Sequence, residues 1–232
     1  MFSKTAQYYD IIYSFKDYQL ESNTIADIIS REKRSAGNRL LDVACGTGLH
    51  MHYLGEHYEV EGFDLDEELL AYARQRIPGA KFHHGDMTDF DLGSGFDVVT
   101  CLFSAIGYVK TTDNLARAIE CMARHLVRGG ILIVEPWLTP DIWQPGAVHA
   151  KFIDEPELKI ARVNTSYVDG SLSYFDMHYL IGTPEGTEHF VERHELGLFT
   201  VEEMITAFEM AGLNVTHEKD GLMGRGLYIG RR

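Results

Sequence analysis

The amino-acid sequence predicts an α/β protein with a mainly parallel, doubly wound sheet and an antiparallel β insertion. Between residues 39 and 135, short apolar runs alternate with stretches of helical spacing, the pattern of strand–helix–strand units. The first run reaches an acidic residue and then a turn with two glycines, at 42–48. Residues 148–196 lose the helical spacing and contain alternating apolar and polar residues, which indicates hairpins.

The segment before the first strand is expected to be partly helical. Residues 8–13 form a short aromatic and apolar stretch, and a helix is expected to follow Lys16-Asp17-Tyr18. The apolar positions of that helix have helical spacing, at Leu20, Ile25, Ile28 and Ile29.

The strands and helices of the core then follow in regular order. The expected strands are 39–44, 59–64, 80–84, 96–101 and 131–135, and the expected helices lie near 47–57, 66–77 and 112–127. Asp66 is placed to cap the second of these helices, and Pro78-Gly79 follows its end. Gly129-Gly130 predicts a turn into the last strand. This alternation implies parallel strands joined by helices.

The pattern changes after Glu135. Prolines punctuate a loop that holds Trp137 and Trp143, and Asp169-Gly170 is a two-residue hairpin signal before a return strand from Leu172. A helix near 200–211 and strands near 213–219 and 226–230 complete the core. We therefore divide the chain into a core of residues 1–136 plus 197–232 and an antiparallel β insertion of residues 137–196 over the carboxyl edge of the sheet.

Composition limits the classes of partner and the compartment. The chain has 232 residues, 45% of them hydrophobic and 24% charged, and its formal net charge is −14. This balance disfavours nucleic acids and anionic membranes, because phosphate contacts need clustered lysine and arginine. Three cysteines, a polar N-terminus without a signal peptide and no apolar run of about 18 residues predict a cytoplasmic protein.

The glycine turn is a candidate ligand loop, since Gly46 and Gly48 let a backbone pass close to a ligand. A dinucleotide-binding loop needs a third glycine where this chain has Met51, and the lysine of a Walker loop is absent. Asp42 would repel a pyrophosphate but suits a cationic amino group. The stretch Leu40–His50 therefore resembles motif I of the class I S-adenosylmethionine (SAM)-dependent methyltransferases.

The ends of the next strands extend this resemblance, because ligands of open α/β sheets bind beyond the carboxyl ends of the strands. Asp64 lies about twenty residues past the glycines, where an acidic side chain can accept both ribose hydroxyls. Asp86 suits the adenine amino group, and Met87 can pack on the ring. The predicted cofactor-binding residues are Tyr13, Asp42, Ala44, Gly46, Gly48, Asp64, Leu65, Asp86, Met87 and Phe103.

Further motifs narrow the resemblance. Gly85-Asp86-Met87, the stretch 103–108, Val134–Trp137 and Gly224–Leu227 together resemble the dTDP-amino-sugar N,N-dimethyltransferases of desosamine and mycaminose biosynthesis. The resemblance implies the Rossmann-like class I methyltransferase fold with an N-terminal helical lid. It also implies SAM as methyl donor, S-adenosylhomocysteine (SAH) as its product, and a dTDP-linked amino sugar as substrate. The segment between Tyr13 and Lys16 is shorter than in that family, which leaves the contacts of this loop open.

Candidates for catalysis follow from the need of an amine to lose a proton before it attacks a methyl group. The predicted catalytic residues are Tyr13, the first candidate near the methyl group, and His178. The other candidates near the methyl group are Tyr108, Glu135, Trp137 and His125. The predicted substrate-binding residues are Arg225, Tyr108 and Trp137, with Arg225 for the pyrophosphate. Lys110, Lys151 and Arg162 are further candidate cations.

Other functions remain open from the sequence. A methyltransferase for another small amine or a hydroxyl, and a SAM-binding protein without catalysis, have the same cofactor motif. The histidines lack cysteine or carboxylate partners at ligand spacing, so no metal is expected. The expected partner is a small molecule, and the exposed strands of the insertion leave a homodimer open.

Overall fold

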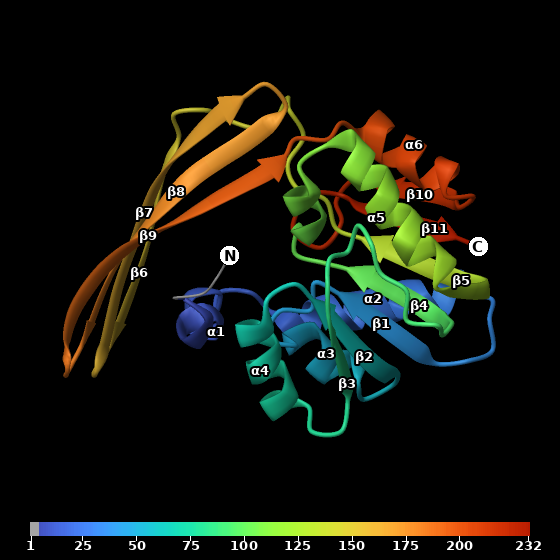
Figure 1. Cartoon of the computed structure of the whole chain (residues 1–232), viewed down its shortest axis with the longest axis horizontal. Coiled ribbons are helices and arrows are strands. Elements are labelled where there is room, and N and C mark those ends of the chain that lie inside the picture. Colours follow the sequence, from blue (N-terminus) through green and yellow to red (C-terminus); the bar gives the residue numbers. More distant parts are fainter. Residues whose placement is uncertain (1–4) are drawn as a thin grey trace.

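The computed structural model describes residues 5–232, which form two β-sheets with helices packed around the larger one (Figure 1). The strands of the larger sheet are β1 (Arg39–Val43), β2 (Glu59–Asp64), β3 (Lys81–His84), β4 (Phe96–Cys101), β5 (Leu126–Val134), β10 (Asn214–Glu218) and β11 (Leu227–Arg231). They lie in the order β10-β11-β5-β4-β1-β2-β3. Strands β1 to β5 are parallel, and β11 runs antiparallel to both of its neighbours.

Helices connect these strands. The α-helices are α1 (Tyr9–Ile12), α2 (Tyr18–Glu32), α3 (Leu49–Leu54), α4 (Glu67–Arg76), α5 (Thr112–Arg124) and α6 (Val201–Met210), and the 3₁₀ helices are η1 (Ala6–Tyr8) and η2 (Ala105–Val109). The Asp66 carboxylate caps α4, as the sequence predicts, by accepting the amides of Glu68 and Leu69. No helix within residues 5–232 has both the length and the apolar character needed to cross a membrane.

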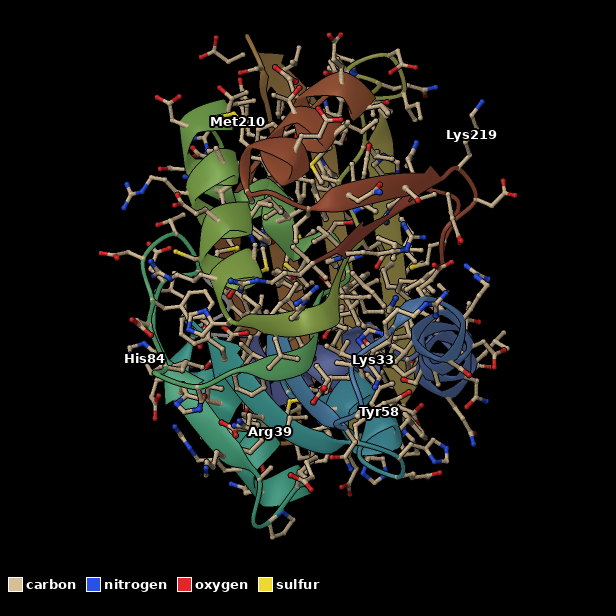
Figure 2. All side chains as sticks on the ribbon, turned by 90° about the vertical axis from the view of Figure 1, so that its right-hand side faces the viewer. Lys33, Arg39, Tyr58, His84, Met210 and Lys219 are labelled. Atoms are coloured by element: carbon tan, nitrogen blue, oxygen red, sulfur yellow. The ribbon has the colours of Figure 1, made fainter. Side chains whose placement is uncertain are left out.

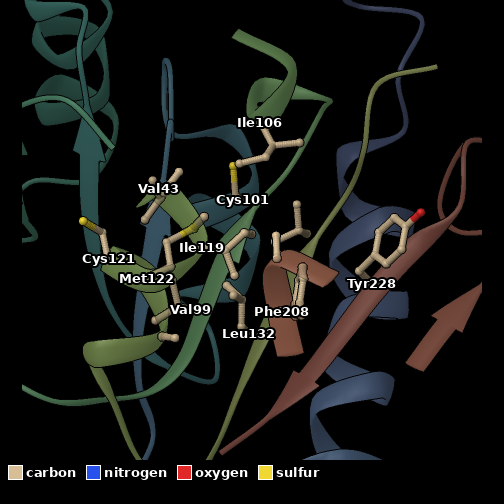
Figure 3. Packing of buried hydrophobic residues seen from close by; sticks show 14 of the residues in the cluster. Val43, Val99, Cys101, Ile106, Ile119, Cys121, Met122, Leu132, Phe208 and Tyr228 are labelled. Atoms are coloured by element: carbon tan, nitrogen blue, oxygen red, sulfur yellow. The ribbon is translucent and has the colours of Figure 1, made fainter. Parts of the chain in front are cut away.

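The core lies on both faces of the larger sheet. Successive side chains of a strand point to opposite faces, so neighbouring residues join different clusters. Val99 and Leu132 pack against α5 and α6 on one face (Figure 3), whereas Val98 and Ile133 pack against α2 on the other. Because both faces are covered, the strands can consist largely of buried apolar residues.

The smaller sheet is antiparallel and consists of β6 (Val148–Glu155), β7 (Leu158–Asp169), β8 (Leu172–Thr183) and β9 (Gly186–Gly197). Figure 1 shows it beside the core, with α1 between its lower part and α4. In Figure 2 the core faces the viewer and the long strands of this sheet lie behind it. Because successive side chains of a strand point to opposite faces, this sheet has one face toward the core and one face away from it. We call these the inner and the outer face.

Three sequence expectations need correction. The helix expected near 47–57 is only Leu49–Leu54, because Gly48 adopts a left-handed conformation (φ 78°) and belongs to the preceding turn. β5 begins at Leu126 and not after the glycine pair, since the strand continues through an irregularity in its pairing with β4. Leu20, expected on the apolar face of α2, is 61% exposed, and the buried face there holds Glu21 instead.

Candidate functional site

A cavity of about 540 Å³ lies between the carboxyl ends of the core strands and the inner face of the β6–β9 sheet. Its volume is within the range of small-molecule sites. The strand order reverses between β1 and β4, and this is the point where open α/β sheets bind their ligands. One end of the cavity is lined by residues that follow β1, β2 and β3, and the other end by residues of the insertion and of the loop before β11. We call these the cofactor end and the substrate end.

The glycine turn after β1 forms the floor of the cofactor end. Ala44, Gly46 and Gly48 all have positive φ angles (61°, 56° and 78°), which is the backbone conformation that glycine adopts without strain. The Asp64 carboxylate accepts the amide of Gly46 at 2.7 Å and that of Asp66 at 2.8 Å. Asp64 therefore fixes the shape of the turn and also lines the cavity.

Helix α1 is tied to this turn. The Thr47 hydroxyl donates to the Asp10 carboxylate of α1 at 2.7 Å, and Arg76 of α4 forms an ion pair with the same carboxylate. These contacts hold α1 and the following Tyr13 beside the cofactor end.

Asp42 and Tyr18 line a small side pocket off the turn. The Asp42 carboxylate is buried and accepts the Thr100 hydroxyl at 2.7 Å. Burial raises the pKa of Asp42 to about 6. The hydroxyl of Tyr18 is also buried and has no hydrogen-bond partner within residues 5–232. A negative charge and an uncommitted donor in one pocket fit the ammonium and the carboxylate of an amino-acid group.

The residues expected at the adenosine all line the main cavity: Leu65, Asp86, Met87 and Phe103. One Asp86 oxygen accepts the amide and the hydroxyl of Thr88, so this carboxylate also shapes its own loop. Tyr13 lies beside Phe103 with ring centroids 5.1 Å apart in an edge-on arrangement. Burial raises the pKa of Tyr13, so its phenol stays protonated.

The loop after β4 has a strained backbone and is held in place by hydrogen bonds to the residues that follow β5. Phe103 and Ser104 both have positive φ angles (52° and 63°), which is unusual for consecutive residues other than glycine. The buried Glu135 carboxylate accepts the Phe103 amide at 2.7 Å, and the Ser104 hydroxyl donates to the carbonyl of Pro136 at 2.7 Å. Glu135 does not line the cavity; its visible role is to hold this loop.

The three predicted substrate residues meet at the substrate end. Arg225 donates to the Ser104 hydroxyl at 2.8 Å, and its guanidinium lies 5.1 Å from the Trp137 ring centre. Tyr108 and Arg162 line the same end. The Arg162 Nη1 atom is buried without a hydrogen-bond partner within residues 5–232. Two guanidinium groups thus lie at the substrate end of an otherwise acidic protein.

Other candidates lie elsewhere. His178 does not line the cavity, because it is exposed on the outer face of β8, where its ring stacks on His189 with centroids 5.6 Å apart. His125 is buried at the end of α5 and accepts the Leu92 amide. Lys110 lines the cavity but is paired with Glu195, and Lys151 lies over the ring of Phe15.

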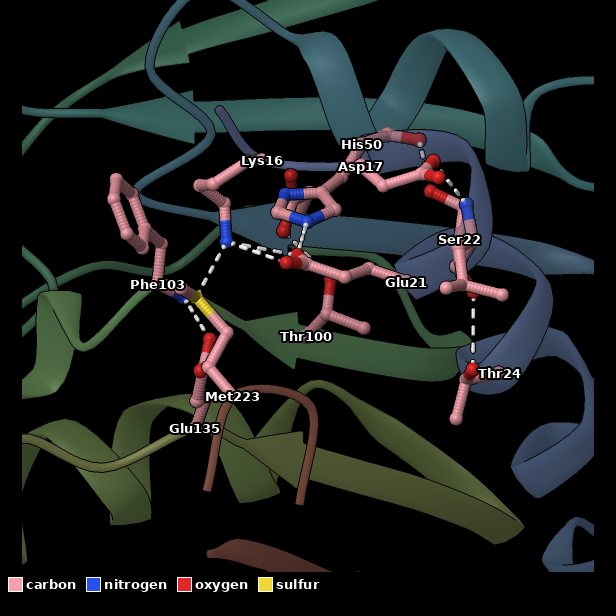
Figure 4. Close-up of polar contacts among 12 residues, drawn as sticks. Lys16, Asp17, Glu21, Ser22, Thr24, His50, Thr100, Phe103, Glu135 and Met223 are labelled. Atoms are coloured by element: carbon pink, nitrogen blue, oxygen red, sulfur yellow. Dashed lines mark hydrogen bonds and ion pairs between the residues drawn. The ribbon is translucent and has the colours of Figure 1, made fainter. Parts of the chain in front are cut away.

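The structure contains a buried charge cluster that the sequence did not predict (Figure 4). The Lys16 ammonium donates to both oxygens of Glu21, at 2.7 and 2.9 Å, and lies 4.1 Å from the Phe103 ring centre. Glu21 also pairs with His50 of α3 at 2.8 Å. The pairing with Lys16 and His50 keeps the pKa of Glu21 low despite its burial. The cluster joins α2, α3 and the strained loop. In the sequence, Glu21 is only an acidic residue within a helical pattern.

Residues 5–232 contain no group of three His, Cys, Asp or Glu side chains that could hold a metal ion.

Comparisons with known proteins agree with this geometry. A family model described as a methyltransferase domain matches residues 40–130. The chain is 40% identical to a dTDP-3-amino-3,4,6-trideoxy-alpha-D-glucopyranose N,N-dimethyltransferase of Streptomyces venezuelae, over 97% of this chain and 96% of the relative. The crystal structure of Streptomyces venezuelae DesVI superposes with a TM-score of 0.92 at 39% identity and covers 98% of each chain.

A SAM-bound amino pentose methyltransferase from Micromonospora echinaspora superposes with a TM-score of 0.88 at 37% identity, covering 97% of this chain and 96% of that one. These matches cover 97–98% of the chain, so both of its sheets take part in them. The chain is a SAM-dependent methyltransferase and belongs to the family of dTDP-amino-sugar N,N-dimethyltransferases.

Proposed function

We propose that this enzyme transfers two methyl groups from SAM to the amino group of a dTDP-linked amino sugar. The relatives that align with the whole chain are named for this reaction on different dTDP-amino sugars. The observation that carries the proposal is the pair Arg225 and Arg162 at the substrate end, beyond the residues of the cofactor end. A diphosphate is the part of such a substrate that needs cations, and a guanidinium can bind it with two parallel hydrogen bonds.

The cofactor end supplies the methyl donor's site in this proposal. SAM contributes an electrophilic methyl group on a positive sulfonium. Asp64 and Asp86 accept hydrogen bonds from ribose and adenine, and Asp42 faces the ammonium. Tyr18 donates to the carboxylate, and the rings of Tyr13 and Phe103 flank the sulfonium. The orphaned Tyr18 hydroxyl supports this assignment, because a buried donor without a partner costs stability unless a ligand satisfies it.

Catalysis then depends mainly on placement. The substrate end holds the sugar so that the amine faces the methyl group, and positioning of this kind can contribute several kcal/mol, up to ~7–11 in ideal cases. Tyr13 is the proposed catalytic-site residue nearest the methyl group, where its protonated phenol orients the reacting groups. His178, on the outer face, has no part in this step.

A product assay tests the substrate class. Purified enzyme is incubated with SAM and either a dTDP-amino sugar or the matching dTDP-sugar with a hydroxyl in place of the amine. We expect masses that correspond to one and then two added methyl groups on the amine only. Methylation of the hydroxyl sugar alone would replace the proposal with an O-methyltransferase, and no methylation of either would reject nucleotide sugars as substrates.

We also propose that the enzyme is a homodimer that packs through the outer face of the β6–β9 sheet. Phe152, Ala161, Leu180 and His189 form one row across all four strands, and Phe152 and Leu180 are 68% and 49% exposed. Four strands about 4.8 Å apart and about ten residues long make a face of roughly 600–700 Å². That area approaches the ~800 Å² that each partner buries in a stable complex.

Sedimentation of the wild type and of Leu180→Glu tests the dimer. The wild type should sediment as a dimer, and the charged variant should be monomeric with an unchanged melting temperature. A monomeric wild type would contradict the proposal. The three cysteines are buried and unpaired within residues 5–232, which supports a reducing, cytoplasmic location for the enzyme.

A further inference from the structure

Tyr108 and His194 form a contact across the cavity wall that has no part in the binding of SAM. Tyr108 belongs to η2 of the core, and His194 belongs to β9 of the insertion. The Tyr108 Oη and His194 Nδ1 atoms are 2.8 Å apart. Gly107 permits this approach, because a Cβ at that position would lie 3.0 Å from Trp137 and Leu196.

His194 is buried and Tyr108 is partly buried, and both are uncharged near neutral pH. Burial and the neighbouring Arg162 lower the pKa of His194 to about 4. Burial raises the pKa of Tyr108 well above its usual value. A phenol is the better donor of the two and a neutral imidazole nitrogen the better acceptor, so the Tyr108 hydroxyl donates the hydrogen bond and His194 Nδ1 accepts it. The lone pairs of the Tyr108 oxygen then remain for another partner, and Tyr108 lines the cavity.

We propose that Tyr108, with its proton held by His194, accepts a hydrogen bond from the substrate amine and thereby turns the nitrogen lone pair toward the methyl donor. His194 is a positioning residue that acts through Tyr108. This inference rests on the proposed function, since it concerns the amine of the nucleotide sugar. Tyr13 and Tyr108 line the same cavity, so Tyr108 lies within reach of the region proposed for methyl transfer.

The number of N–H bonds on the amine before each transfer explains why such an acceptor matters. In each transfer the nitrogen lone pair forms an N–C bond, the S–C bond breaks, and its electron pair stays on sulfur. The resulting ammonium loses one proton to water before the nitrogen can react again. The neutral amine has two N–H bonds before the first transfer, one before the second and none afterwards. An acceptor at Tyr108 therefore orients the first two substrates and cannot orient the tertiary amine.

The two transfers depend on this contact to different degrees. A primary amine that loses Tyr108 keeps a second N–H for other acceptors, and either N–H can leave the lone pair in a productive direction. A secondary amine has one N–H. Without an acceptor for it, rotation about the sugar C–N bond exchanges the positions of the methyl group and the lone pair. Loss of the Tyr108 hydroxyl should therefore slow the second transfer more than the first.

Single-turnover rates for each transfer in Tyr108→Phe test this inference. The matched control is Tyr174→Phe, which removes a tyrosine hydroxyl from β8, where the ring stacks on Tyr167 and does not line the cavity. We expect the second transfer to fall about tenfold and the first about threefold or less, the size of one lost hydrogen bond. Monomethylated product should accumulate in Tyr108→Phe and not in the control, with little change in the KM for the dTDP-sugar.

Two variants of His194 separate positioning from packing. His194→Asn keeps an acceptor near the position of Nδ1, and His194→Leu removes it. The proposal expects monomethylated product to accumulate with leucine and the wild-type product ratio to return with asparagine. An equal product ratio in both variants would overturn the role of His194.

The failure of this inference is distinguishable from the failure of the proposed function. If the wild type does not methylate a dTDP-amino sugar, the proposed function fails. If the wild type adds two methyl groups and a folded Tyr108→Phe variant, confirmed by unchanged SAH affinity, has the same ratio of first to second rate, only this inference is overturned.

Discussion

The cofactor end of the cavity is formed by strand ends of one sheet, whereas the substrate end is assembled from segments far apart in the chain. Asp42 and Asp64 lie at the carboxyl ends of β1 and β2, and Asp86 follows β3; these three strands are neighbours in the sheet. At the substrate end, Arg162 comes from β7 and Arg225 from the loop before β11. The first end is acidic and shaped by backbone conformation, and the second is aromatic and carries guanidinium groups. The two ends should therefore respond independently to mutation.

The largest effect is expected at the cofactor end from Asp64→Ala. The substitution leaves the amides of Gly46 and Asp66 without their acceptor and removes the proposed ribose contact. We expect SAH affinity to fall at least a hundredfold and the unfolding free energy to fall by about 2–4 kcal/mol. Calorimetric titration and chemical denaturation measure the two quantities. Near-wild-type SAH binding in a folded Asp64→Ala protein would contradict the assignment of this end.

Acid should weaken cofactor binding through Asp42. The pKa of this carboxyl in the free protein is raised to about 6, and a bound ammonium favours the ionised form. SAH affinity should be constant above about pH 7 and should fall by up to tenfold for each unit below pH 6. In the free protein the sign is opposite, because the folded state binds this proton more tightly and gains stability at this site as the pH falls from 6 toward 4.

Asp42→Asn provides the control for that profile. The variant cannot ionise at position 42, so it should bind SAH weakly and with a flatter pH dependence between 5 and 7. A wild-type affinity that is level across this range would mean that Asp42 does not face the ammonium.

The smallest effect is expected from Tyr18→Phe. The Tyr18 hydroxyl is buried without a partner in residues 5–232, so its removal should leave the melting temperature unchanged or raise it slightly. SAH affinity should nevertheless fall about three- to tenfold, because the proposed donor to the carboxylate is lost. Opposite signs in binding and stability distinguish a ligand contact from a packing residue. Loss of stability with unchanged SAH affinity would remove Tyr18 from the site.

The contrast between the two ends also explains what the sequence could predict. Asp64 and Asp86 were predictable because parallel strands bring their carboxyl ends to one edge, so order along the chain gives position in space. Alternation predicted the hairpins of the insertion, and family resemblance pointed to Arg225. His194 was not foreseen, since its partner Tyr108 lies on another element and no local spacing connects the two residues.

Residues whose sequence pattern is ambiguous account for the other differences between the predictions and the structure. His178 and His194 occupy the same kind of alternating stretch, and only the register of β8 and β9 decides which one faces the core. Leu20 follows the helical spacing but is exposed, because buried Glu21 is stabilised by Lys16 and His50, which come from other segments. Contacts of this kind depend on the tertiary structure, and neither propensity nor periodicity reports them.

The independence of the two ends is tested most directly by titrating dTDP into SAH-saturated enzyme. The titration compares the wild type with Arg225→Ala and with Lys219→Ala, an exposed cation whose side chain points into solvent (Figure 2). We predict that dTDP binds the wild type and Lys219→Ala equally. In Arg225→Ala its affinity should fall about ten- to a hundredfold while SAH affinity stays the same. Equal dTDP affinity in all three proteins, or no dTDP binding at all, would contradict the assignment of the substrate end.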